Sequence, residues 1–179
     1  MRAHIVLSHP EPQSFNAQLA SRSRQTLFDA GWEISFSDLY AMDFDPRESS
    51  VHYPQRKDPQ VFHAQTEQRH GAQHGALPDQ VEYEIQNLMA CDLVIAHFPL
   101  WWFGMPAMLK GWMDRVFVYG QMYRSEVRYD RGVCTGKRAL VCVTTGASRE
   151  SCAPNGREGD TQMHLAFMSD IASDRSTVI

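Results

Sequence analysis

Short apolar runs separated by polar segments predict four β-strands. Residues 4–7 form an apolar run that ends at a Ser-His-Pro break, and residues 32–37 alternate between apolar and polar side chains. Strict alternation is typical of a strand with one polar face. Residues 92–98 and 139–143 are almost continuously apolar, as expected of central strands that are buried on both faces.

Apolar residues at helical spacing predict three helices between these strands. The first helix runs from Ser14, which is a good N-capping residue, to about Ala30, and Gly31 closes it. The second covers residues 79–90. The third begins with Pro106 at its first helical position.

A long polar insert, residues 42–78, separates the second strand from the second helix. It is rich in proline, glutamine and histidine, and we predict no regular structure for it. Inserts of this length are usually functional or contact a partner. His70 and His74 lie four residues apart within it, and we expect both in solvated loop.

The order of strands and helices predicts an α/β fold. Strands alternate with helices, and two strands are uniformly apolar, which indicates a parallel sheet with helices on both faces. In such a sheet, ligands bind beyond the carboxyl ends of the strands. The three loops that follow residues 4–7, 92–98 and 139–143 are therefore the candidate site.

Composition narrows the class of protein. The chain has 179 residues, enough for one domain, and a net charge of −4 with 17 basic and 21 acidic residues, which disfavours nucleic-acid binding. We expect no membrane span and no secretory leader, and hence a cytoplasmic protein. The four cysteines form no C-x-x-C pair, so we expect small buried side chains and no metal site.

The first loop has the features of an anion site. It leads from His9 into a helix whose first turn carries Ser14 and Asn16. Free N–H groups and the positive end of the helix dipole favour a phosphate there. The loop has no glycine, so it contains neither a dinucleotide fingerprint nor a P-loop. A simple serine N-cap is the alternative explanation.

The second loop carries three large aromatic residues, Trp101, Trp102 and Phe103, directly after a buried strand. Exposed aromatic rings are costly, so they indicate either a flat wall for ring stacking or a loop folded back into the core. The aromatic residues alone leave these two alternatives open.

The third loop begins with hydroxyl side chains and small residues. Thr144 and Thr145 supply donors and acceptors, and Gly146 and Ala147 permit a planar ring to approach the backbone. Together the three loops describe a phosphate end, a stacking wall and a polar edge. A flavin nucleotide meets all three requirements.

These motifs resemble the NAD(P)H:quinone oxidoreductases of the DT-diaphorase type. The resemblance rests on residues 8–16, 37–42 and 144–146, on Gly159 and Asp160, and above all on the segment PLWWFGMPAMLKGW at residues 99–112. It runs from Arg2 to about His164. It implies a flavodoxin-like three-layer sandwich with strand order 2-1-3-4-5, bound FAD, a homodimer, and reduction of quinones by NADH or NADPH.

The resemblance also implies roles for individual residues. Those expected to bind the cofactor are His9, Ser14, Phe15, Asn16, Pro99, Leu100, Trp101, Trp102, Phe103, Thr144, Thr145, Gly146 and Ala147. Trp102, Phe103, Tyr123 and Gly146 would serve catalysis, with the first three bordering a slot that nicotinamide and quinone occupy in turn in a ping-pong reaction. Asp114 and His63 would reach the cofactor of a second subunit. The long insert favours FAD over FMN.

The chain departs from this family at two places. By spacing, Cys152 and Glu158 stand where the family has a tyrosine and a histidine, and Ser125 replaces a second active-site tyrosine. Residues 167–179 have no family character, so we expect the domain to cover residues 1–166 and the fifth strand to be missing. These departures keep two alternatives open: a regulatory flavoprotein partner of a cation transporter, or an inactive remnant of the family.

Overall fold

The computed structural model describes residues 1–127, 131–160 and 177–178. A parallel sheet forms its centre, with strands in the order β2-β1-β3-β4-β5. The four longer strands are β1 (Arg2–Leu7), β2 (Glu33–Asp38), β3 (Leu93–Pro99) and β4 (Arg138–Thr144). The predicted α/β class and the order 2-1-3-4 are confirmed, and each predicted strand lies within two residues of its expected bounds.

The fifth position of the sheet is not empty, which corrects the expectation of a missing strand. β5 (Thr177–Val178) pairs in parallel with Leu140 and Val141 of β4. It covers only two residues of the seven in β4, so most of that edge is unpaired within the described part of the chain. The expected domain boundary at residues 166 and 167 lies outside the described residues.

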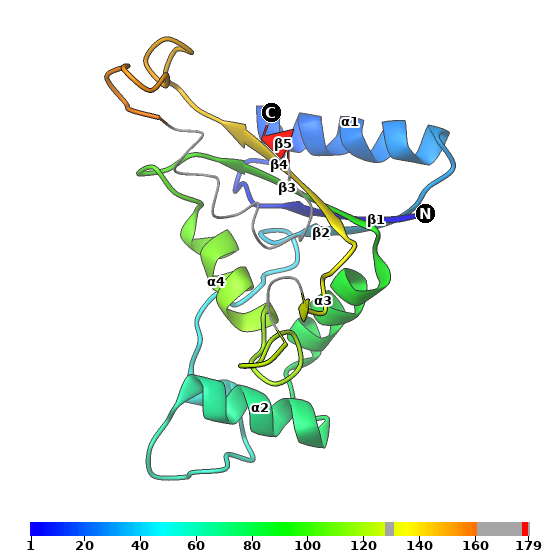
Figure 1. The fold of residues 1–179 in the computed structure, drawn as a ribbon, viewed down its shortest axis with the longest axis vertical. Helices are drawn as coiled ribbons and strands as arrows, with labels where there is room; N and C mark the ends of the chain where they lie inside the picture. The colour runs from blue at the N-terminus through cyan, green and yellow to red at the C-terminus, as the bar shows by residue number, and fades with distance from the viewer. Residues whose placement is uncertain (128–130, 161–176, 179) are drawn as a thin grey trace.

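Helices cover both faces of the sheet and make the three layers (Figure 1). α1 (Phe15–Asp29) lies on one face, and α3 (Asp79–Ala90) and α4 (Ala107–Val116) lie on the other. Ser14 caps α1 as predicted, because its side chain accepts a hydrogen bond from the Ala17 N–H. Pro106 is the N-cap of α4 rather than its first helical residue.

The core has two parts, one on each face of the sheet. Under α1, Ile5, Leu7 and Ile95 pack with Ala20. Under α3 and α4, the larger part includes Phe98, Leu109 and other apolar side chains. β1 and β3 contribute alternate residues to both parts, which is the reason for their nearly continuous apolar sequences.

Strict alternation would place the polar face of β2 in water, but one end of this face is buried. Ser37 is buried and donates to Glu84 Oε1 of α3 at 2.6 Å. His4 Nε2 lies 3.2 Å from Glu84 Oε2, and Trp112 Nε1 donates to the same oxygen at 2.8 Å. Burial alone would raise the pKa of Glu84, but the bonds and charge of these partners outweigh burial and lower it.

The insert, residues 42–78, contains regular structure, contrary to our prediction. It holds a 3-10 turn, η1 (Ser50–His52), and a helix, α2 (Ala64–His74), so His70 and His74 are helical rather than in a loop. Buried Glu67 anchors this region, because its carboxylate accepts the backbone N–H groups of Lys57 at 2.8 Å and Asp58 at 3.1 Å. α2 lies farther from the sheet than α4 (Figure 1).

None of the helices in the described ranges is long and apolar enough to cross a membrane.

Candidate active site

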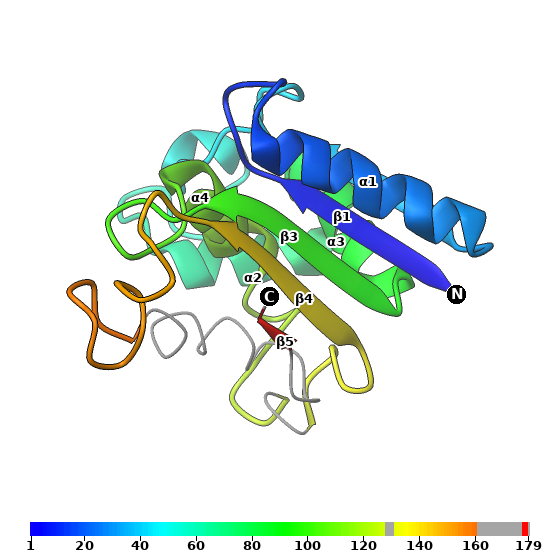
Figure 2. The ribbon, with the colours of Figure 1, turned by 90° about the horizontal axis from the view of Figure 1, so that it is seen from above.

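The carboxyl ends of β1, β3 and β4 meet at one edge of the sheet, as expected of parallel strands (Figure 2). Backbone hydrogen bonds tie the three following loops together. Ser8 N–H donates to the His97 carbonyl at 2.9 Å, and Leu100 N–H donates to the Thr144 carbonyl at 2.8 Å. The three sequence-predicted loops therefore form a single surface.

The first turn of α1 is joined to the end of β4. Asn16 Nδ2 donates to Thr144 Oγ1 at 2.7 Å, although the two residues are 128 positions apart. Asn16 Oδ1 and Ser8 Oγ are buried and have no hydrogen-bond partner among the residues that the structure describes. Buried polar atoms normally have partners, so these two atoms fit a polar ligand at this end of the site. Phe15 is 65% exposed beside them.

The aromatic turn after β3 is exposed, which favours the stacking wall over the loop folded into the core. Trp101, Trp102 and Phe103 are 44%, 97% and 48% exposed. Trp101 and Gly104 exchange backbone hydrogen bonds of 3.0 and 3.1 Å, which close the turn. Within it, Trp102 and Phe103 have φ of 51° and 59°.

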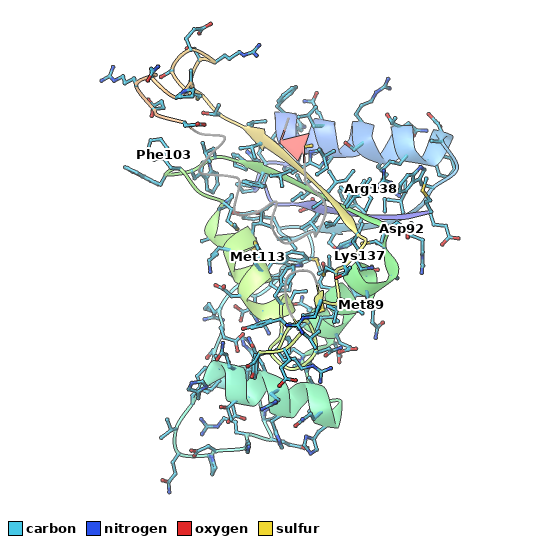
Figure 3. The ribbon with its side chains drawn as sticks, in the orientation of Figure 1. Met89, Asp92, Phe103, Met113, Lys137 and Arg138 are labelled. Carbon is cyan, nitrogen blue, oxygen red and sulfur yellow. The ribbon has the colours of Figure 1, made fainter. Side chains whose placement is uncertain are left out.

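Such left-handed backbone is strained for large side chains, and strain of this kind is typical of functional sites. The turn therefore holds its rings at the surface at a cost in free energy. Figure 3 shows Phe103 beyond the end of β3, at the opposite end of the sheet from Lys137 and Arg138.

His9 lies between the first and second loops. Its Nδ1 accepts a hydrogen bond from the Glu11 N–H at 2.9 Å, which fixes the ring. The ring centroid is 6.4 Å from that of Trp101. The loop after β1 and the aromatic turn are thus in reach of one ligand.

The loop after β4 leaves open space at the predicted position. Thr145 Oγ1 accepts from the Ala147 N–H at 3.1 Å, and a Cβ atom added to Gly146 would meet no atom of the described residues within 4 Å. The protein's own packing therefore leaves Gly146 accessible. Residues 148–160, with Cys152 and Glu158, continue as a loop that projects from the end of β4 (Figure 1).

Three predicted site residues lie elsewhere, around α2. His63 is the N-cap of α2, and Gln65 Nε2 donates to the Tyr123 hydroxyl at 3.1 Å. Gln68 Nε2 donates to the Asp114 carbonyl at 3.1 Å, while the Asp114 carboxylate pairs with Lys110 at 2.5 Å. α4 separates this group from the aromatic turn, since the turn precedes its first residue and α2 lies near its last (Figure 1).

The structure also places a polar residue at the site that we did not predict. His97 of β3 is 1% exposed, and within the described part of the chain neither ring nitrogen has a hydrogen-bond partner. Burial lowers its pKa to about 4, so the ring is neutral at pH 7. The signal in the sequence was a single histidine within an otherwise apolar strand.

Comparisons with known proteins agree with this geometry. The family model described as "Flavodoxin-like fold" matches residues 1–173. NAD(P)H dehydrogenase [quinone] 1 of Rattus norvegicus is 40% identical over 92% of this chain and 60% of its own. Ribosyldihydronicotinamide dehydrogenase [quinone] of Pongo abelii is 39% identical over 90% of this chain and 70% of its own.

The chain belongs to the flavodoxin-like family. It spans 60% to 70% of the length of these two relatives. A crystal structure from Klebsiella pneumoniae, described provisionally as a quinone reductase, superimposes with a TM-score of 0.90 at 30% identity. The superposition covers 100% of this chain and 73% of the Klebsiella pneumoniae chain. The flavodoxin-like sandwich that we expected is thus confirmed.

Proposed function

We propose that this flavodoxin-like protein is a flavin-dependent oxidoreductase that reduces quinones with NAD(P)H. The reaction converts NAD(P)H, a proton and a quinone into NAD(P)⁺ and a hydroquinone. The observation that carries the proposal is the strained, exposed aromatic turn of residues 101–104 beside a helix N-terminus with unpartnered buried polar atoms. The names of the two relatives favour this enzyme over a transporter partner.

The residues at the strand ends fit a flavin nucleotide. The free N–H groups at the start of α1, with Ser8 and Asn16, would hold its phosphate end. Trp101 and its neighbours, with Pro99 and Leu100 behind them, would line its ring system, and Thr145 with the backbone near Gly146 would meet the polar ring edge. The flavin would supply hydride transfer in both directions.

The protein's own part in this reaction is to bind and orient. Trp102 and Phe103 present flat apolar surfaces that would align a nicotinamide or quinone ring parallel to the cofactor and exclude water. The backbone N–H groups after β4 are fixed dipoles that would stabilise developing negative charge. Because one slot would serve both substrates, we expect ping-pong kinetics.

We infer that the active unit is a homodimer that binds FAD. His63, Asp114 and Tyr123 lie around α2, at the other end of α4 from the aromatic turn of their own chain. A second copy could bring its α2 region to the turn and border the adenosine end of a long cofactor. FMN, which has no adenosine, would not use these residues.

The proposal is tested by the cofactor and by turnover. We expect purified protein to be yellow and to release FAD on heating, which chromatography separates from FMN, at one FAD per chain. It should oxidise NADH or NADPH in the presence of a quinone such as menadione. Colourless protein that takes up neither flavin, or flavin-loaded protein without quinone reduction, would contradict the proposal. A monomer in sedimentation would contradict the homodimer.

A further inference from the structure

A second concave surface lies on α2, away from the aromatic turn. It is a groove of about 360 Å³ between α2, Lys57 and Tyr119. It is lined by two cationic residues, Lys57 and Arg69, by three histidines, His63, His70 and His74, and by neutral polar residues. Among the described residues, no carboxylate lines it. This concentration of basic groups contrasts with the net charge of −4 of the whole chain.

The two permanent cations of the groove have no acidic partner. Within the described ranges, neither Lys57 nor Arg69 forms an ion pair, whereas nearby Arg47 and Lys110 pair with Asp45 and Asp114. The Arg69 guanidinium lies 5.3 Å from the centroid of the Tyr119 ring, which holds it in place. Unpaired, positioned cations favour the binding of an anion.

His70 and His74 could instead suggest a metal site. Their ring centroids are 4.2 Å apart, and His74 Nδ1 donates to the His70 carbonyl at 2.8 Å, so Nε2 is the ring nitrogen of His74 that could bind a metal. Within the described residues, however, no third His, Cys, Asp or Glu joins them to complete a metal-binding group. Lys57 and Arg69 would also repel a divalent cation from the same groove.

The positive charge of the groove therefore favours an anion over a metal ion. We propose that the α2 groove, lined by Lys57 and Arg69, binds a phosphate group. Lys57 and Arg69 would donate charge-assisted hydrogen bonds, and Gln65, Thr66 and Gln73 offer further donors from one side of α2. The phosphate could be free or carried on a nucleotide. This assignment rests on the charge of the groove and not on the proposed quinone reduction, although His63 borders both the groove and the proposed contact with the FAD of a second subunit.

Calorimetric titration of the full-length, flavin-saturated chain at pH 7 in low salt tests the proposal. We expect inorganic phosphate to bind with a dissociation constant of about 1 mM, as two charge-assisted contacts in an open groove imply. Adenosine 2′,5′-bisphosphate provides the second arm. Binding more than about tenfold tighter than phosphate would identify a nucleotide as the source, and equal or weaker binding would identify a free phosphate.

Matched variants locate the site. Lys57→Gln and Arg69→Gln should each weaken phosphate binding about tenfold, while Arg22→Gln, an equal charge change on exposed α1, should leave it unchanged. Since Arg69 packs on Tyr119, its substitution could affect folding. Within the described residues the Lys57 ammonium has no hydrogen-bond or ion-pair partner, and Glu67 binds only the Lys57 backbone N–H, so Lys57→Gln is the decisive variant.

Two results would overturn the assignment. One is the absence of phosphate binding up to 20-fold above the expected constant, or binding that Lys57→Gln leaves intact. The other is stoichiometric uptake of Zn²⁺ that depends on His74 while phosphate does not bind, which would make the groove a metal site.

Discussion

Replacing the buried histidine of β3 should change how stability depends on pH. His97 is fully enclosed under α1, in register with Leu7 and Cys142 of the neighbouring strands. Its pKa in the folded protein is about 4, against an ordinary value of 6.5. In His97→Leu the titrating group and its two unpartnered nitrogens are removed together.

The magnitude follows from the two pKa values. Above pH 6.5 the ring is neutral in both states and has no effect on the pH dependence. Between pH 6.5 and 4 the unfolded chain binds a proton that the folded chain does not, so the wild type loses stability as the pH falls. Each pKa unit corresponds to about 1.4 kcal/mol, so the loss reaches about 3 kcal/mol at pH 4.

Urea unfolding of the wild type and His97→Leu at pH 7, 6, 5 and 4 measures this loss. We expect the difference in unfolding free energy to grow in favour of the variant by about 3 kcal/mol from pH 7 to pH 4. Other titrating groups, Glu84 included, are present in both proteins and cancel in the difference. Parallel stability curves would refute the reasoning, because they would mean that the folded ring takes up its proton normally.

Three further substitutions test the fold and the site. Glu84→Ala leaves the donors of Ser37 and Trp112 without a partner, so it should lower the free energy of unfolding by about 3–5 kcal/mol in thermal unfolding. The control Glu82→Ala, on the half-exposed side of the same helix, should lower it by less than about 1 kcal/mol. Trp102→Gly relieves a left-handed φ, so it should keep or raise the melting temperature while it weakens flavin binding; unchanged flavin affinity would contradict the stacking role. Gly111→Ala would place a Cβ atom into Pro46, so it should destabilise the protein although alanine favours helices; a gain in stability would show that the insert gives way.

Local signals in the sequence were sufficient for most of the fold. Ser14 capped α1 as predicted, and the apolar runs of β3 and β4 marked the central strands. α2 was missed because its buried residues include Glu67 and Gln68, which pack through hydrogen bonds and carry no apolar period. β5 was missed because two residues are too few for a recognisable apolar pattern, and the strand they pair with is distant in the sequence.

The candidate site also has parts that the sequence predicts and parts that it does not. Its three loops could be predicted because parallel topology alone brings the ends of β1, β3 and β4 together. The exposure of Trp102 could not, since the sequence allowed a buried turn equally well. His63, Asp114 and Tyr123 gather around α2 through contacts between segments that no local pattern encodes.

The contacts of the Glu84 carboxylate affect how the protein unfolds. The carboxylate belongs to α3 and binds groups from β1, β2 and α4, so detachment of β1, β2 or α4 costs it one partner, and detachment of α3 breaks all three contacts. That penalty discourages piecemeal opening. Amide protons on this side of the sheet should therefore exchange with solvent together, through one concerted event, while the ends of α1 fray independently.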